Sequence, residues 1–216
     1  MARRTRERDS VRVGEVVAVL GGALLLAGSW IIVAARDHLP KFEVRIFDAV
    51  NGLPDFIWPV VWVPMQLGSF VASFVVAAIT LAVSRNWRLG AATLLATQLA
   101  FWSAKSVKNI VLRGRPNALI IDVNVREHAQ GLGYVSGHAA VAFSLAAVIG
   151  PSLPRRWWPV AIALPIVVAF ARVYSGAHLP LDVIGGAGVG LLAGTLSRWV
   201  FGLGGEGLPA THPEAA

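Results

Sequence analysis

The sequence predicts an all-α membrane protein, a polytopic bundle of six transmembrane helices. Of the 216 residues, 56% are hydrophobic and only 14% are charged. A soluble domain of this length needs a larger charged surface, so the composition favours a membrane protein with one compact domain. A membrane span needs about 20 apolar residues. We predict spans at 13–35, 56–83, 89–104, 135–150, 159–174 and 182–203.

The first predicted span follows a basic segment, residues 1–12, and is interpreted as a retained anchor because its apolar stretch is too long for a signal peptide. The third to fifth spans are short, so polar flanking turns must join their helices at the membrane surface. The arginines between spans two and three, between four and five, and near the end are Arg85, Arg88, Arg155, Arg156 and Arg198. With six spans they share one side with the basic segment, and the positive-inside rule makes that side cytoplasmic. Both termini are therefore expected in the cytoplasm, with residues 13–203 as the six-span domain and 204–216 as a flexible tail.

Two segments have patterns of their own. Residues 36–55 set apolar side chains among charges, which suits either an amphipathic helix on the outer membrane surface or an ordinary connecting loop. The last span carries a face of small residues: Gly185, Gly186, Gly188, Gly190 and Gly194. Such a face lets helices approach closely, and we favour packing inside the bundle over a homodimer interface.

The composition also excludes several function classes. The formal net charge is +7, but the cations flank apolar spans and form no basic stripe, so nucleic acid is not an expected partner. The chain has no cysteine, which excludes disulfides and thiolate metal sites.

Ionisable residues gather in three short segments, each at the end of an apolar stretch. These segments are KNIVLRGRP at 108–116, YVSGH at 134–138 and ARVYSGAHLPLD at 171–182. Ionisable groups beside membrane spans are costly unless they are paired or hydrated. In the six-span topology all three segments face the outer side, although the spans were counted without them. We therefore predict one divided anion-binding site on that side.

Three cations in these segments suit a phosphate group: Lys108, Arg115 and Arg172. An arginine offers two coplanar donors to two phosphoryl oxygens. The Ser136-Gly137 turn can add backbone amides and a helix N-terminus. For Lys105 and Arg113, a role in topology or as a headgroup anchor is an equally good interpretation.

Two histidines and one carboxylate complete the predicted site. His178 and Asp182 are four residues apart, so the carboxylate can fix the imidazole tautomer and leave the other ring nitrogen as nucleophile or base. His138 can protonate a leaving oxygen. These three residues could instead bind a metal, but three nearby cations would repel a divalent ion, so no metal is expected. His38 and His212 are interpreted as solvated residues without chemistry.

The three segments resemble the motifs of the type 2 phosphatidic acid phosphatase family, which shares its core with bacterial acid phosphatases and vanadium haloperoxidases. The family pattern is K-x6-RP, PSGH and SR-x5-H-x3-D. The chain has Lys108-x6-Arg115-Pro116, Val135-Ser136-Gly137-His138 and Ala171-Arg172-x5-His178-x3-Asp182. Val135 replaces the usual Pro and Ala171 the usual Ser, and neither change removes a group with a covalent or proton-transfer role.

The resemblance implies a role for each residue of the site. His178 would form a phosphohistidine, Asp182 would orient it, and His138 would protonate the leaving alcohol and activate water. The phosphoryl oxygens would be held by Lys108, Arg115, Arg172, Ser136 and Gly137. Neither a metal nor another cofactor would be required.

We therefore expect a lipid phosphate phosphatase in a bacterial cytoplasmic membrane, with its site on the outer face. Its substrate would be phosphatidic acid, phosphatidylglycerol phosphate, or a polyprenyl phosphate or diphosphate. Phosphotransfer to a lipid or sugar acceptor is the open alternative, and a non-catalytic lipid binder or transporter is less well supported because both histidines and the carboxylate are present. Residues 117–133 would form a rim that selects substrates, with Arg126 as either a headgroup contact or a solvated charge.

Overall fold

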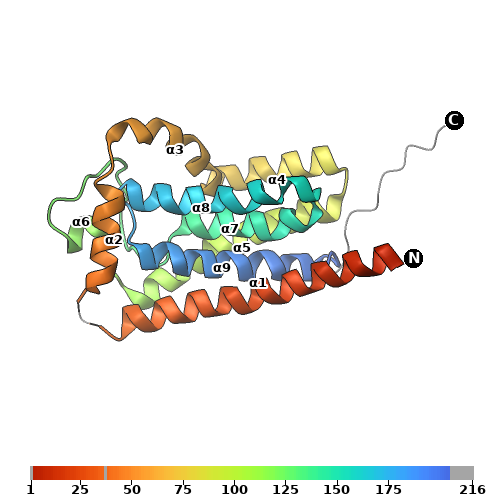
Figure 1. The fold of residues 1–216 in the computed structure, drawn as a ribbon, viewed down its shortest axis with the longest axis horizontal. Helices are drawn as coiled ribbons and strands as arrows, with labels where there is room; N and C mark the ends of the chain where they lie inside the picture. Colours follow the sequence, from red (N-terminus) through yellow and green to blue (C-terminus); the bar gives the residue numbers. More distant parts are fainter. Residues whose placement is uncertain (1, 37, 205–216) are drawn as a thin grey trace.

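The computed structural model describes residues 2–36 and 38–204, and every regular element in these residues is helical (Figure 1). Six helices form an elongated bundle: α1 (Ala2–Ala34), α4 (Phe70–Ser84), α5 (Trp87–Val111), α7 (Gly137–Ile149), α8 (Trp158–Tyr174) and α9 (Pro180–Val200). Three shorter helices, α2 (Lys41–Asn51), α3 (Trp58–Met65) and α6 (Pro116–Leu119), lie at one end or along one side. Single 3-10 turns, such as Gln66–Gly68 before α4, connect some of these elements.

The apolar helices confirm the predicted class, an all-α membrane protein. Three segments are long and apolar enough to cross a membrane: Arg12–Ala34, Arg155–Tyr174 and Pro180–Val200. A fourth is the pair Asp55–Gly68 and Phe70–Ser84, which is bent by 72°. By length and composition the described residues thus contain three or four spans, whereas the sequence predicts six.

The bend is the main departure from the predicted spans. The stretch 56–83, expected as one helix, breaks at Ser69, whose hydroxyl accepts a hydrogen bond from the backbone N–H of Ala72 at 3.2 Å and so begins α4. Pro64 lies inside α3, just before the break, and proline disrupts the hydrogen-bond ladder of a helix. The break leaves Met65 and Gly68 beside the end of the bundle at which α7 begins, and both contact residues of the predicted site there.

The glycine face of α9 packs inside the bundle, as expected. A Cβ atom on Gly186 would lie 2.5 Å from the carbonyl oxygen of Ser136, at the start of α7. A Cβ atom on Gly188 would lie 2.6 Å from the carbonyl oxygen of Gly22 in α1. Glycine is therefore required where α9 meets both neighbours. In the apolar stretch of α9, 67% of the residues are buried, against 11% in that of α1.

The segment 36–55 contains a helix rather than only a loop. Helix α2 crosses the end of the bundle, with Glu43, Phe47 and Asn51 buried beneath it and Phe42 and Ile46 about half-exposed (Figure 1). Helix α1 begins at Ala2 and so includes residues 2–12 of the predicted basic segment. The predicted flexible tail, 204–216, lies outside the described residues except for Gly204, and so does His212.

Candidate active site

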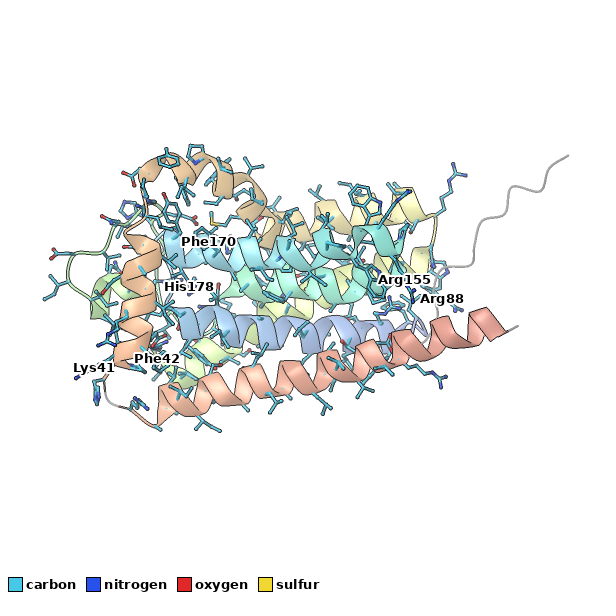
Figure 2. All side chains as sticks on the ribbon, viewed as in Figure 1. Lys41, Phe42, Arg88, Arg155, Phe170 and His178 are labelled. Carbon is cyan, nitrogen blue, oxygen red and sulfur yellow. The ribbon has the colours of Figure 1, made fainter. Side chains whose placement is uncertain are left out.

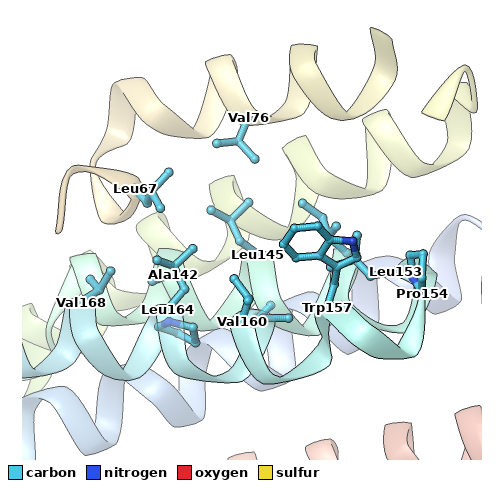
Figure 3. Close-up of a pocket in the computed structure, with 15 residues that line it drawn as sticks. Leu67, Val76, Ala142, Leu145, Leu153, Pro154, Trp157, Val160, Leu164 and Val168 are labelled. Carbon is cyan, nitrogen blue, oxygen red and sulfur yellow. The ribbon is translucent and has the colours of Figure 1, made fainter. Parts of the chain in front are cut away.

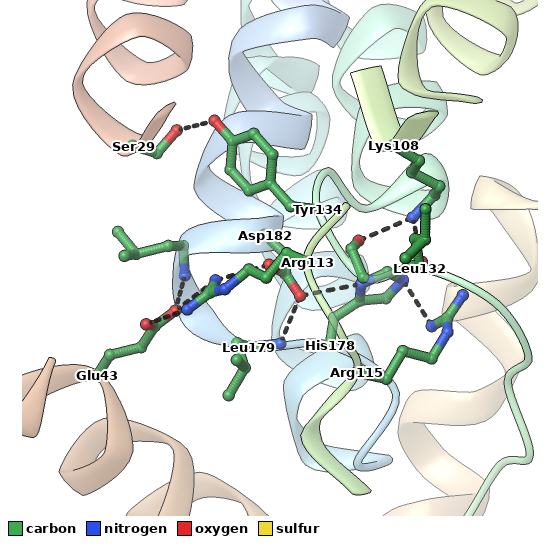
Figure 4. A network of polar contacts seen from close by, with 12 residues as sticks. Ser29, Glu43, Lys108, Arg113, Arg115, Leu132, Tyr134, His178, Leu179 and Asp182 are labelled. Carbon is green, nitrogen blue, oxygen red and sulfur yellow. Dashed lines mark hydrogen bonds and ion pairs between the residues drawn. The ribbon is translucent and has the colours of Figure 1, made fainter. Parts of the chain in front are cut away.

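The three predicted segments meet at the end of the bundle that α2 covers (Figure 4). Lys108 lies in the last turn of α5, His138 in the first turn of α7 and Arg172 in the last turn of α8. His178 belongs to the turn between α8 and α9, and Asp182 to the first turn of α9. All eight catalytic and phosphate-binding candidates therefore lie in this region, although they come from segments up to 74 positions apart, from Lys108 to Asp182.

The local fold of the α8–α9 turn places the carboxylate behind the imidazole. Helix α9 begins at Pro180, which has no N–H to leave unpaired in a first helical turn. Asp182 is therefore in position to accept a hydrogen bond from the backbone N–H of Leu179 at 2.9 Å, with the same oxygen, Oδ2, 3.4 Å from Nδ1 of His178. Both His178 and Asp182 are buried, so this pairing is shielded from water.

The other nitrogen of His178 faces a cation. Nη1 of Arg115 lies 3.3 Å from Nε2 of His178. A guanidinium can only donate, so this contact favours the tautomer with its proton on Nδ1, facing Asp182, and a lone pair on Nε2. Burial lowers the pKa of His178 well below its ordinary value, and the charges of Lys108, Arg172 and Arg115 lower it further. At neutral pH the imidazole is uncharged and Nε2 can act as a nucleophile.

Backbone carbonyls of the loop before α7 hold two of the predicted phosphate-binding cations. Lys108 Nζ donates to the carbonyl oxygens of Leu132 and Gly133 at 3.0 and 2.8 Å. Arg115 donates through Nε to two further carbonyls of that loop and through Nη1 to the carbonyl of Ala177 at 2.7 Å. Burial and the nearby charge of Arg172 lower the pKa of Arg115, so these cations repel one another and would be stabilised by an anion between them.

The third cation has an acidic partner that sequence reasoning missed. Arg172 is buried, and its Nη1 donates to Oε1 of Glu127 at 2.7 Å. In the described part of the chain, Nε of Arg172 and Oε2 of Glu127 have no hydrogen-bond partner, although both atoms are buried. Buried polar atoms without partners are uncommon in native proteins and mark places where a ligand can bind.

The Ser-Gly turn begins α7 at the edge of the site. The hydroxyl of Ser136 accepts a hydrogen bond from the N–H of Ala139 at 3.4 Å, and the N–H of Ser136 donates to the carbonyl of Asp182 at 2.8 Å. Gly137 lines a cavity of about 400 Å³ together with Lys108 and Arg115. The N-terminus of α7 thus lies beside the cations, the arrangement expected of an anion site.

His138 is half-buried and packs against the bend before α4. A Cβ atom on Gly68 would lie 2.5 Å from the carbonyl oxygen of His138. The charges of the same three cations, Lys108, Arg115 and Arg172, act on both His138 and His178. The two histidines therefore belong to one site, as their motifs predict.

Arg113, for which the sequence left a topological or anchoring role open, is instead part of a buried ion-pair network. It donates to Oδ1 of Asp182 at 2.8 Å and to Oε1 and Oε2 of Glu43 at 3.1 and 2.5 Å (Figure 4). Glu43 also accepts the backbone N–H of Leu181 at 2.9 Å. The only sequence signal for this network was a carboxylate on the amphipathic segment that became α2.

Arg126, which the sequence left as either a headgroup contact or a solvated charge, is held by partners within the protein. Its guanidinium donates to the carbonyls of Asn51, Leu53 and Tyr174 and to Asp55, and it lies 4.0 Å from the ring centroid of Tyr174. These partners occupy its donors and bury all but 9% of its side chain. Arg126 therefore fastens the rim loop to the residues that follow α2.

An apolar groove of the bundle is separate from this site. It has a volume of about 370 Å³, lies between α4, α7 and α8, and is lined by residues such as Val76, Leu145, Trp157 and Val160 (Figure 3). None of its lining side chains is ionisable. Among the described residues, no group of three or more His, Cys, Asp and Glu side chains is arranged to hold a metal ion.

The geometry defines a helical membrane protein with a histidine–carboxylate pair beside a cluster of cations. Residues 87–204, which contain the whole cluster, match the family model described as the PAP2 superfamily, and the chain belongs to this superfamily.

Known proteins similar to this chain are membrane lipid phosphatases. The chain is 28% identical over 188 residues to the lipid A 4'-phosphatase of Bacteroides thetaiotaomicron, covering 76% of this chain and 77% of that one. It is 27% identical over 158 residues to the undecaprenyl-diphosphatase of Sulfolobus acidocaldarius, covering 67% and 71%. The crystal structure of a transmembrane PAP2-type phosphatidylglycerolphosphate phosphatase from Bacillus subtilis has the same fold, with a TM-score of 0.70, 21% identity and coverage of 88% and 98%.

Proposed function

We propose that this protein is an integral membrane lipid phosphate phosphatase with His178 as its nucleophile. The observation that carries the proposal is the orientation of His178, whose Nδ1 faces Asp182 while Nε2 faces Arg115. A carboxylate behind one nitrogen and cations before the other are what an in-line attack on a phosphoryl group requires. Lys108, Arg115, Arg172 and the Ser136–Gly137 turn would hold the phosphoryl oxygens.

The proposed reaction has two steps. Nε2 of His178 forms a bond to phosphorus, and the P–O bond to the leaving group breaks. The leaving oxygen takes the electron pair of that bond and a proton from His138. In the second step water attacks the phosphohistidine and gives its proton to His138. The N–P bond then breaks, and inorganic phosphate leaves.

The proposed topology has six spans, cytoplasmic termini and an outward-facing site in a bacterial cytoplasmic membrane. Arg88 and Arg155 lie at the end of the bundle opposite His178 (Figure 2), which supports this orientation under the positive-inside rule. Helices α5 and α7 would be the two further spans. Their apolar stretches are short, with α7 only 13 residues long, so flanking turns would complete them.

The substrate class follows from the relatives and from the position of the site. Proteins similar to this chain are named for undecaprenyl diphosphate and lipid A, and a structural neighbour for phosphatidylglycerol phosphate. A site at the end of an apolar bundle lets the lipid tails of such substrates stay in the membrane while the phosphate reaches His178. We therefore propose a phosphomonoester or diphosphate of a lipid as the substrate.

Phosphate release in detergent with excess EDTA tests the proposal. The purified wild type, His178→Ala and the exposed-residue control His38→Ala would be assayed on phosphatidic acid, phosphatidylglycerol phosphate, a polyprenyl diphosphate and a soluble aryl phosphate. We expect His178→Ala to lose at least about a thousandfold in kcat while His38→Ala keeps its rate. Unchanged release by His178→Ala would overturn the assigned nucleophile. Transfer of labelled phosphate to an added alcohol in place of release would favour a phosphotransferase.

A further inference from the structure

The cavity of about 400 Å³ beside the active site contains a cation that the proposed mechanism does not use. Its lining includes Lys108, Arg115 and Gly137 of the site, and it continues along α5 past Lys105 to Ala104 and Phe101. Phe101, Lys105 and Lys108 follow the i, i+4, i+7 spacing of one helix face. The cavity is therefore a groove that leads from the phosphate site along α5.

The chemistry of this groove changes in order along α5. Phe101 and Ala104 are apolar, Lys105 follows one turn later, and Lys108 reaches the phosphate site. A lipid diphosphate has the same order of parts: an apolar tail, an inner phosphate and a terminal phosphate. Side chains three positions apart on a helix are about 5–6 Å apart at Cβ, so two lysines at this spacing can each reach one of two linked phosphates.

The two lysines differ in their partners. The ammonium of Lys108 is hydrogen-bonded to the carbonyls of Leu132 and Gly133. Lys105 is exposed, and within residues 2–36 and 38–204 its ammonium forms no hydrogen bond or ion pair; it lies 5.1 Å from the ring centroid of Trp102. An exposed cation–π contact is weak, so it would not prevent Lys105 from turning to an anion in the groove.

We propose that Lys105 binds the inner, non-scissile phosphate of a lipid diphosphate and thereby selects diphosphates over monophosphates. The inference rests on the proposed function, because it requires the terminal phosphate to lie at His178. The tail would then leave the site over Ala104 and Phe101. The competing role for Lys105 is that of an interfacial anchor beside the half-exposed Trp102, which would not distinguish the two substrates.

A comparison of two substrates with one lipid tail tests the proposal. The ratio of kcat/KM for the diphosphate to kcat/KM for the monophosphate would be measured for the wild type, Lys105→Gln, Lys105→Arg and Lys41→Gln. Lys41 is a matched control because it is exposed and lies on α2, outside the groove. We expect Lys105→Gln to lower the ratio about tenfold, because it removes a charge-assisted hydrogen bond. Lys105→Arg should restore most of it, and Lys41→Gln should leave it unchanged.

Each other outcome has a definite meaning. An unchanged ratio in Lys105→Gln would overturn the proposal. If kcat/KM fell equally on both substrates, Lys105 would be an interfacial anchor. Hydrolysis of neither lipid by the wild type would overturn the proposed function instead. The subsite would then be tested by thermal stabilisation with methylenediphosphonate and with inorganic phosphate. Preferential loss of the diphosphonate effect in Lys105→Gln would support it, and equal stabilisation of both proteins would overturn it.

Discussion

Arg113 donates a hydrogen bond to Asp182 at 2.8 Å and so connects the carboxylate behind His178 to a second buried carboxylate, Glu43 of α2. The side chain of Arg113 is 8% exposed, and those of both carboxylates are fully buried. One guanidinium therefore compensates two buried negative charges. The orientation of His178 depends in this way on a helix that contributes no residue to the phosphate site.

Replacing Arg113 with Gln is expected to destabilise the protein and inactivate it. Both carboxylates would remain buried without a counter-ion, and breaking a buried ion pair costs about 3–5 kcal/mol. Thermal unfolding in detergent and phosphate release would be measured together. Arg45→Gln, at an exposed position of α2, is the control and should behave as the wild type. An Arg113→Gln protein of normal stability and activity would show that the network does not hold Asp182 in place.

The same network marks the limit of what the sequence could predict. The order and spacing of the three motifs predicted that His178, His138 and the three cations lie together, because each motif is local and the three-part pattern is specific. Arg113 and Glu43 are 70 positions apart, and no local pattern pairs them. Their contact depends on where α2 crosses the bundle, which follows from the packing of several helices. The bend at Ser69 was missed for a different reason: the stretch 56–83 is mostly apolar and so favours a single span, although Pro64 and Ser69 interrupt it.

The lowered pKa of His178 predicts how stability changes with pH. In the unfolded chain this histidine titrates near 6.5, whereas burial and the nearby cations keep it neutral in the folded protein to well below that value. As pH falls below 6.5 the unfolded state takes up a proton that the folded state does not, so the contribution to stability present above pH 6.5 is progressively lost. The loss is at most about 1.4 kcal/mol per pH unit for one such group. Melting temperatures between pH 5 and 8 should therefore fall less steeply on acidification in His178→Asn than in the wild type. Parallel curves would contradict the assignment.

The contact between Gly68 and His138 predicts that the bend before α4 positions the start of α7. A Cβ atom on Gly68 would lie 2.5 Å from the carbonyl oxygen of His138 and 2.8 Å from its Cα. Backbone atoms must then move, and overpacking of this kind typically costs about 1–3 kcal/mol. We expect Gly68→Ala to lower both melting temperature and kcat. Gly28→Ala on α1, where nothing lies within 4 Å, should lower neither. If both variants kept full activity, His138 would not depend on the bend.

The ion pair between Glu127 and Arg172 predicts competition between a carboxylate and the substrate. Glu127 Oε1 lies 2.7 Å from Nη1 of Arg172, so a phosphoryl group that binds Arg172 must displace this carboxylate or share the arginine with it. Glu127→Gln keeps the size of the side chain and removes its charge. We expect the variant to lower KM and the inhibition constant of inorganic phosphate several-fold. Without the carboxylate of Glu127, a phosphate has no competitor for Arg172 and is no longer repelled by a nearby negative charge.

Asp122→Asn is the matched control for this experiment, because Asp122 is an exposed acid on the same rim loop. It removes an equal charge from an acid that forms no ion pair with Arg172 among the described residues, so a purely long-range effect of loop charge would change both variants alike. The split between KM and kcat separates the remaining roles of Glu127. A lower KM at constant kcat identifies a competitor for the phosphate site. A fall in kcat with KM unchanged would instead mean that Glu127 positions Arg172 for the transition state, since its loss would then weaken an interaction made only there.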